Sequence, residues 1–357
     1  MRRTLRAIIA SAACAAALTI PFAGAEAASK KEFNIAWTIY VGWMPWAYAA
    51  ENGIVKKWAD KYGITIDVTQ INDYVESINQ YTAGKFDAVT VTNMDTLTIP
   101  AAGGVDSTAL IIGDYSNGND GVVLKGAKKL EDIKGRKVNL VELSVSHYLL
   151  ARGLASVKLS ERDVTVVNTS DADIVAAFAS ADVNALVTWN PQLSEILKTP
   201  GATEVFSSKQ TPGEILDLAV VNTQVLKDNP SFGKALVGAW FETMALMVKD
   251  DAAGKAARTA MGKLSGTTLE GYEAQLKTTF MYHEPKAAVA AAQSPELITT
   301  MDLVRTFSFE HGLLGEGAKS KDVVGIAFPG GKVLGDEKNV KMRFNADYMQ
   351  MAADGKL

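Results

Sequence analysis

Short β-rich runs alternate with helical stretches along most of this chain. Strands are predicted at residues 33–39, 64–70, 87–92, 107–113, 137–142, 164–168, 185–189 and 203–207. Beyond Asn229, Ala-rich amphipathic stretches predict helices as far as about His311. Such alternation of strands and helices is typical of an α/β fold in which helices cover both faces of a mainly parallel sheet.

One pattern occurs twice. Residues 86–93, Phe-Asp-Ala-Val-Thr-Val-Thr-Asn, close one helix-to-strand unit, and residues 183–190, Val-Asn-Ala-Leu-Val-Thr-Trp-Asn, close another about a hundred residues later. Both copies end in an asparagine, where the strand gives way to the next helix. Ligands of open α/β sheets bind outside the carboxyl ends of the strands. The repeat therefore predicts two doubly wound lobes with a ligand-binding cleft between them.

Two strand-like segments, 119–124 and 214–222, each lie beside a turn-rich sequence and are predicted to be antiparallel hinge strands between the lobes. They divide the chain into lobe 1, residues 32–119 plus 220–357, and lobe 2, residues 120–219. A chain of this length exceeds the size at which a single core keeps growing, which also favours two lobes.

Residues 1–27 have the pattern of a secretory signal peptide. Three arginines precede an apolar run from Ala7 to Ile20, and small residues suited to cleavage follow it. The run is shorter than the ~20 apolar residues that a permanent membrane span needs. We therefore expect an exported protein, and the periplasm is the natural compartment because an outer membrane would retain it.

The charge and cysteine content exclude several classes of function. The chain has 36 Lys and Arg against 40 Asp and Glu, a net charge of −4, which is unlike a nucleic-acid-binding protein. Its single cysteine, Cys14, lies in the predicted leader, so the mature chain has no thiol for a disulfide, a metal site or catalysis. The three histidines have no metal-ligand spacing, and no common catalytic or phosphate-binding motif occurs. We expect no enzyme activity, no cofactor and no metal.

The segments that should face the cleft contain acids and aromatic rings but neither Lys nor Arg. Their acids are Asp73, Glu76, Asp95, Asp114, Asp120, Glu142, Glu195, Glu214 and Asp217, and their aromatic residues are Trp37, Tyr40, Trp43, Trp46, Tyr74, Tyr115, Tyr148 and Trp189. A ring face attracts positive charge and a carboxylate pairs with it. A planar guanidinium matches such a site best, because it pairs with carboxylates and stacks on rings. Neutral urea could donate hydrogen bonds to the same acids, whereas an anion would be repelled.

The candidate ligand-binding residues are Trp37, Tyr40, Trp43, Asp73, Asn93, Asp95, Asp120, Glu142, Ser144, Trp189, Asn190 and Asp217. Glu142 is the foremost candidate because it ends a predicted strand just before a helix, although it could instead cap that helix or pair across the hinge. Asp95 has a similar alternative as a helix cap. Asp217 alternates with two leucines, so it faces either the ligand or solvent.

Several motifs, in order and spacing, carry a resemblance to a known family. They are Trp37 to Trp46, Ala83-Gly-Lys-Phe-Asp87, Leu130 to Val138, Ser146-His-Tyr-Leu-Leu150, Asp163 to Asn168 and Trp189-Asn-Pro191. Over roughly residues 33–230 the chain resembles the nitrate/sulfonate/taurine-type (NMT1/THI5-like) substrate-binding proteins of ABC importers. It is most similar to the urea-type branch associated with urea or guanidine carboxylase genes.

This resemblance implies a periplasmic-binding-protein fold. It also implies that the protein is a monomer and works with an ABC permease and ATPase subunits. The ligand would stack in lobe 1, and lobe 2 would then close with Glu142 and Trp189. Alternative ligands are a sulfonate, nitrate, a thiamine-precursor pyrimidine or a polyamine. Pyrimidine-precursor synthases of thiamine biosynthesis share the fold, but they rely on a cysteine-rich iron motif that the mature chain lacks.

Overall fold

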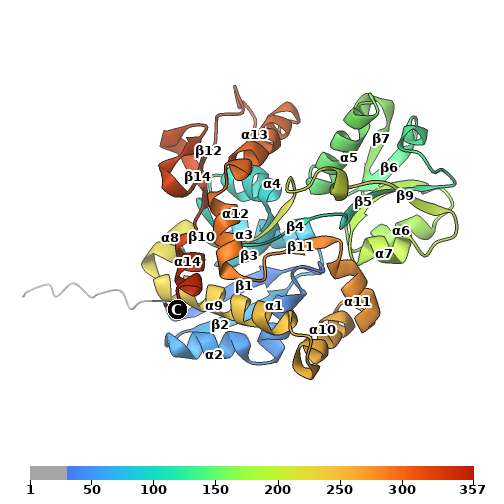
Figure 1. Cartoon of the computed structure of the whole chain (residues 1–357). Coiled ribbons are helices and arrows are strands. Elements are labelled where there is room, and N and C mark those ends of the chain that lie inside the picture. The colour runs from blue at the N-terminus through green and yellow to red at the C-terminus, as the bar shows by residue number, and fades with distance from the viewer. Residues whose placement is uncertain (1–29) are drawn as a thin grey trace, which may run out of the picture.

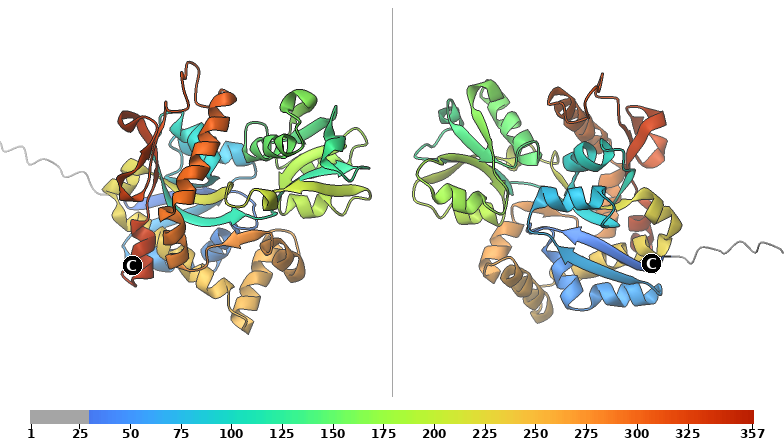
Figure 2. Two further views of the ribbon diagram at one scale, coloured as in Figure 1. Left: turned by 45° about the horizontal axis from the view of Figure 1, so that its top comes forward. Right: turned by 180° about the vertical axis from the view of Figure 1, so that it is seen from behind.

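The computed structural model describes residues 30–357, so the predicted signal peptide, residues 1–27, lies outside the described residues. Figure 1 shows two lobes side by side, each built around its own sheet, and Figure 2 shows the same division from two further directions. Within residues 30–357, no helix combines the length and apolar character needed to cross a membrane.

The larger lobe contains a mixed sheet of order β13-β12-β14-β4-β10-β3-β1-β2, with β11 paired to β4. Its strands are β1 (Glu32–Trp37), β2 (Thr65–Gln70), β3 (Ala88–Thr92), β4 (Ser107–Ser116), β10 (Leu216–Asn222), β11 (Thr279–Met281), β12 (Gly325–Ala327), β13 (Val333–Leu334) and β14 (Val340–Phe344). Strands β1, β2 and β3 are parallel, whereas β10 runs antiparallel to both β3 and β4. The expectation of a mainly parallel sheet is therefore wrong at its centre, because the chain re-enters this sheet from the second lobe in the opposite direction.

Helices surround this sheet. They are α1 (Met44–Glu51), α2 (Ile54–Lys61), α3 (Tyr74–Thr82), α4 (Asn93–Thr96) with a π-helical turn (Leu97–Ala101), α8 (Thr223–Asp228), α9 (Pro230–Met247), α10 (Ala252–Leu264), α11 (Leu269–Leu276), α12 (Pro285–Gln293), α13 (Pro295–Glu310) and α14 (Asp347–Ala353), with 3-10 turns at Pro329–Gly331 and Glu337–Asn339. Every residue of β3 is buried, and its β-branched side chains suit a strand covered by helices. Strand β3 is accordingly an interior strand of the large sheet, between β10 and β1.

The smaller lobe has a sheet of order β7-β6-β8-β5-β9. Its elements are β5 (Asp120–Lys125), β6 (Lys137–Leu140), α5 (Val145–Ser156), β7 (Thr165–Asn168), α6 (Ile174–Ala179), β8 (Ala185–Trp189), α7 (Gln192–Ile196) and β9 (Ala202–Ser207), with 3-10 turns at Leu130–Ile133, Glu161–Asp163 and Ser208–Gln210. Strand β5 is antiparallel to β8 and β9, while β6 is parallel to β7 and β8.

Each of the strands predicted from the sequence is confirmed within a few residues. The short strands β11 to β14 were not predicted, and the predicted hinge strands are corrected. Strand β5 lies wholly in the small sheet and β10 wholly in the large one, so these two strands do not pair with each other. The chain instead crosses between the sheets at residues 117–119 and 208–215, and residues 216–219, assigned to lobe 2 by the sequence, pair within the large sheet.

Candidate functional site

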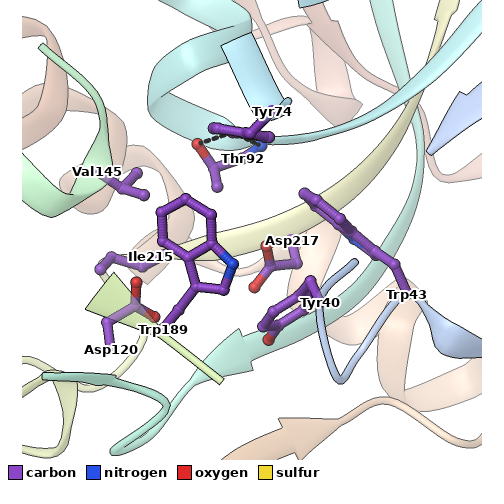
Figure 3. Close-up of a pocket in the computed structure, with 9 residues that line it drawn as sticks. All are labelled: Tyr40, Trp43, Tyr74, Thr92, Asp120, Val145, Trp189, Ile215 and Asp217. Atoms are coloured by element: carbon purple, nitrogen blue, oxygen red, sulfur yellow. Dashed lines mark hydrogen bonds between the residues drawn. The ribbon is translucent and has the colours of Figure 1, made fainter. Parts of the chain in front are cut away.

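A small cavity lies between the lobes, close to the carboxyl ends of β3 and β8. The space inside it, open solvent at its mouth included, is about 290 Å³, and it is lined by Tyr40, Trp43, Tyr74, Thr92, Asp120, Val145, Trp189, Ile215 and Asp217. The side chains leave little free space inside the pocket, so it suits a ligand of few atoms. Figure 3 shows the Asp217 carboxylate between the rings of Trp189, Tyr40 and Trp43. None of the nine lining residues is basic.

Aromatic rings form a continuous chain around the cavity. The ring of Trp43 lies 5.0 Å from that of Tyr40 and 5.9 Å from that of Tyr74, with interplanar angles of 71° and 30°. The ring of Tyr74 in turn meets that of Trp189 at 5.6 Å and 70°. This last pair crosses from the large lobe to the small one. A flat ligand would therefore meet ring faces contributed by both lobes.

Four carboxylates surround the same cavity. Asp120 and Asp217 line it, and Asp95 and Asp114 lie directly behind the lining; all four are between 0% and 3% exposed. Within residues 30–357, no Lys, Arg or His forms an ion pair with any of them. Glu214 differs, because Arg152 pairs with it through two nitrogen atoms. The charge of the four acids is thus not balanced by a protein cation.

Strand pairing positions two of these acids, Asp114 and Asp217. Asp114 of β4 and Asp217 of β10 are register partners in the large sheet. The Tyr40 hydroxyl donates to Asp114 Oδ1 at 2.6 Å, and Asp114 Oδ2 has no hydrogen-bond partner. A side chain at Gly42 would place its Cβ only 2.4 Å from this free oxygen, so glycine is required where the loop after β1 passes the carboxylate.

The other two acids are held by hydroxyl groups. Asp95 Oδ2 accepts from the Tyr74 hydroxyl at 2.7 Å and from Thr92 Oγ1 at 2.9 Å, while its Oδ1 has no partner. Asp120 Oδ2 accepts from Ser116 Oγ at 2.5 Å. These contacts fix the carboxylates in place but supply no positive charge.

Burial changes the acidity of the whole group. It raises the pKa of Asp95 to about 6, and that of both Asp114 and Asp120 to about 7. The pKa of Asp217 rises well above its usual value because of burial first and then the nearby charges of Asp114 and Asp120. A cation held among these carboxylates would offset the raised pKa values, because opposite charge favours the ionised form.

The structure brings five of the candidate residues to the cavity: Tyr40, Trp43, Asp120, Trp189 and Asp217. Asp95 lies behind the lining, as described above. The alternative that Asp217 faces solvent is wrong, because this side chain is 3% exposed.

Five further candidates lie elsewhere and have structural contacts. Trp37 is buried at the end of β1, Asp73 caps α3 by accepting from the Glu76 N–H, and Ser144 caps α5. The Asn93 amide donates to the Glu214 carbonyl and accepts from the Leu216 N–H, while Asn190 Oδ1 accepts from the Ser194 N–H. Asn93 and Asn190 therefore form hydrogen bonds that hold the backbone beside the cavity, and neither residue lines the cavity.

Glu142, the foremost candidate from the sequence, is exposed and does not line the cavity. Strand β6 ends at Leu140, and the backbone reverses at Leu143, whose φ is 64°. After this reversal α5 begins, and its first residue, Val145, reaches the cavity in place of Glu142. Ser144, not Glu142, caps the helix.

Four of the lining residues are not among the candidates from the sequence: Tyr74, Thr92, Val145 and Ile215. Tyr74 was among the aromatic residues expected near the cleft, and Thr92 directly precedes the selected Asn93. Val145 and Ile215 have apolar side chains that carry no chemical signal. Asp114 was counted among the cleft acids but was not selected.

A second polar group joins the lobes away from the cavity. The ligand atoms of His147, Glu161 and His311 lie within 4.8 Å of one another, close enough to hold a metal ion. However, His147 Nδ1 accepts the Leu143 N–H at 3.1 Å, so the proton of the neutral ring is on Nε2, which contacts Glu161. A metal at Nε2 would displace this proton and leave the ring with none, because Nδ1 faces the Leu143 N–H and cannot carry it. The three residues are therefore arranged as a hydrogen-bonded chain, which sequence spacing did not reveal.

Further hydrogen bonds also hold the lobes together around the cavity. The Val41 N–H donates to the Asn190 carbonyl at 3.3 Å, and Asn190 Nδ2 donates to Thr278 Oγ1 at 3.2 Å. The structure is thus a closed form, in which two sheet-based lobes enclose a site at the ends of their strands. This arrangement defines the periplasmic-binding-protein fold.

Comparison with known proteins agrees with this class. Residues 47–253 match the family described as NMT1/THI5 like, and the chain belongs to that family. The alkanesulfonate-binding protein SsuA of Xanthomonas axonopodis pv. citri, bound to MOPS, has a similar fold, with a TM-score of 0.66, 18% identity, and coverage of 81% of this chain and 96% of that one. The periplasmic nitrate-binding protein NrtA of Synechocystis PCC 6803 gives a TM-score of 0.65 at 12% identity, with coverage of 91% and 89%.

One curated relative is a Brucella abortus (strain 2308) protein that is named only as a candidate binding protein. It is 25% identical over 199 residues, which cover 54% of this chain and 59% of the relative. The match thus spans less than two thirds of that relative's length.

Proposed function

We propose that this chain is the extracytoplasmic solute-binding protein of an ABC importer and captures a small planar nitrogen compound, guanidine or urea, by closure of its lobes. Its fold and family support a binding role. The observation that carries the ligand class is the cavity itself, in which four buried acids stand beside a chain of aromatic rings and form no ion pair with a Lys, Arg or His of residues 30–357. The permease and ATPase subunits of the importer would be its partners, and the protein would act as a monomer.

A guanidinium ion satisfies both components of this cavity. Its N–H groups can pair with the carboxylates of Asp120 and Asp217, and its face can stack on a ring such as Trp43 or Trp189. Each desolvated contact of this kind contributes about 1–3 kcal/mol. Urea has nearly the same shape and can donate hydrogen bonds to the same oxygens, but it lacks the charge that the acids favour.

Closure follows from the division of the lining between the lobes. Tyr40, Trp43 and Asp217 belong to the large lobe and would receive the ligand first. The small lobe then adds Asp120 and Trp189, and its movement removes the ligand from water. Asp120 thus takes the role that the sequence pattern had suggested for Glu142.

A sulfonate, nitrate or thiamine-precursor pyrimidine is the alternative ligand. The relatives named for sulfonate and nitrate favour an anion, but such a ligand would lie beside Asp120 and Asp217. These acids would tolerate it only when protonated, in which form they can donate hydrogen bonds. Catalysis is the least favoured alternative, because the cavity offers no basic residue or thiol among its lining residues.

A thermal-shift screen tests the ligand class. The mature chain is unfolded in the presence of guanidinium, urea, methylguanidine, taurine, nitrate and hydroxymethylpyrimidine, with sodium chloride as the control for ionic strength. We expect guanidinium to raise the unfolding temperature by several degrees, because a ligand that binds only the folded state stabilises it. A rise with taurine or nitrate and none with guanidinium would reverse the ligand class and leave the fold unchanged.

The substitution Glu142→Gln should leave guanidinium affinity unchanged within about twofold, the usual effect of a surface substitution far from special contacts. Glu142 is exposed and outside the cavity lining, so removing its charge changes no contact with the ligand. Titration calorimetry of the variant beside the wild type measures the effect. A tenfold loss of affinity would return Glu142 to the site and contradict the arrangement described above.

A further inference from the structure

Asp171 joins the two lobes through a single buried contact. It lies in the small lobe, before α6, and is 4% exposed. Its Oδ1 accepts the backbone N–H of Tyr74, the first residue of α3 in the large lobe, at 3.1 Å. The contact places a carboxylate of one lobe at the N-terminus of a helix of the other, where the helix dipole favours negative charge.

The residue that Asp171 holds is central to the ligand cavity. The Tyr74 hydroxyl donates to Asp95, and its ring contacts both Trp43 and Trp189. The Tyr74 backbone therefore sets the position of a ring that faces the ligand from one side and the closing lobe from the other. Because Asp171 belongs to the other lobe, it can fix this backbone only when the lobes are together.

We propose that Asp171 is a positioning residue that couples closure of the lobes to the placement of Tyr74 in the ligand cavity. The inference rests on the proposed function, since it assumes that the cavity captures a ligand by closure. In an open form the Tyr74 N–H would face water, and Asp171 would be solvated. Closure replaces the contacts that these two groups make with water by one charge-assisted hydrogen bond between them. Such a bond is stronger than a bond between neutral groups.

A role in the stability of α3 alone does not account for this contact. Asp73 already caps the same helix from within the large lobe, where it accepts the Glu76 N–H at 2.8 Å. Asp73 can do so whether the lobes are open or closed. Asp171 adds its bond in the closed form only, so its removal should speed the opening that releases the ligand and leave the first encounter unchanged.

The carboxylate is suited to this task near neutral pH. Burial raises the pKa of Asp171 to about 6, with the Tyr74 N–H acting in the opposite direction and the charge of Asp73 adding to the rise. Above that pH the group is ionised and accepts a strong hydrogen bond. The contact needs only an acceptor oxygen, so an asparagine at this position should retain part of it.

Stopped-flow tryptophan fluorescence with guanidinium as the ligand tests the proposal on the full mature chain. Asp171→Ala should raise the dissociation rate constant roughly ten- to hundredfold and change the association rate constant by less than about threefold. Asp171→Asn, which keeps an acceptor oxygen, should fall between the alanine variant and the wild type. Asp73→Ala is the matched control, since it removes a cap of the same helix and should lower the unfolding temperature without raising the dissociation rate constant.

An unchanged dissociation rate constant in Asp171→Ala would overturn the proposal, as would equal changes in the two alanine variants. The test is separable from that of the ligand. If the wild type binds taurine and not guanidinium, the ligand assignment fails, and the same comparison of Asp171 and Asp73 variants is made with taurine. In that case a faster release confined to the Asp171 variants still supports the coupling.

Discussion

Replacing Asp217 by asparagine should weaken guanidinium binding by about ten- to a hundredfold and at the same time make the ligand-free protein more stable. Asparagine has the same shape, but it removes the charge that pairs with the ligand. Without ligand, burial first and then the charges of Asp114 and Asp120 raise the pKa of Asp217 well above the usual value. The amide cannot carry this buried charge, and its N–H can donate to the neighbouring Asp114 carboxylate. Titration calorimetry and thermal unfolding measure the two effects.

The opposite signs of the two effects make this prediction specific. A residue that only supports the fold would lose stability and affinity together when it is replaced. Glu142→Gln is the matched control, because it also converts a carboxylate near the strand ends into an amide, but at an exposed position. An Asp217→Asn variant that binds guanidinium as tightly as the wild type would remove this acid from the ligand site.

Guanidinium affinity should rise as the pH increases from 6 to 8. Burial raises the pKa of Asp95 to about 6 and that of Asp114 and Asp120 to about 7, so below these values the ligand must displace protons from the acids. Each proton released changes the affinity by about tenfold per pH unit below the pKa of that acid. We expect a gain of about tenfold or more over this range, measured by calorimetric titrations at pH 6, 7 and 8.

The ligand-free protein should show the reverse dependence. For an acid whose pKa is raised on folding, the folded state binds its proton more tightly than the unfolded state, where the pKa is about 4. The contribution of these acids to stability is therefore complete below pH ~4 and is lost as the pH rises through about 7. Urea binding should depend much less on pH, because no ion pair forms. A guanidinium affinity that stays flat or falls from pH 6 to 8 would show that the acids do not act as its counter-charges.

The sequence was sufficient for the parts of the fold that depend on local pattern. Strand β3 is buried along its whole length, and its run of β-branched residues between a turn and an amide was recognisable. The strands β12 and β13 have only three and two residues, too few to show a pattern. The direction of β10 depends on where the chain returns from the small lobe, which is a property of the tertiary structure and not of the strand sequence.

The site was predictable where strand and loop ends determine it. Tyr40, Trp43 and Asp217 reach the cavity because they lie at or beside the ends of core strands. The error at Glu142 arose within the turn before α5, where a positive φ at Leu143 decides which side chain turns inward. Sequence periodicity gives no information on such a turn.

Contacts between lobes were the least predictable feature. Asp171 and Tyr74 are separated by 97 residues, and neither position suggests that one caps the other. The same holds for His147 and His311, whose approach depends on how the lobes close. Such pairs follow from the docking of two finished units, so they lie beyond what local pattern can indicate.

Guanidinium, urea and nitrate form a series of planar, Y-shaped molecules of similar size whose charges are +1, 0 and −1. Titration calorimetry of the mature chain with all three, in one buffer at pH 8, therefore measures the preference of the cavity for charge at nearly constant shape. The structure predicts that guanidinium binds most tightly, that urea binds at least about tenfold more weakly, and that nitrate gives no measurable binding. Nitrate binding more tightly than guanidinium would contradict the account of a negatively charged aromatic cavity.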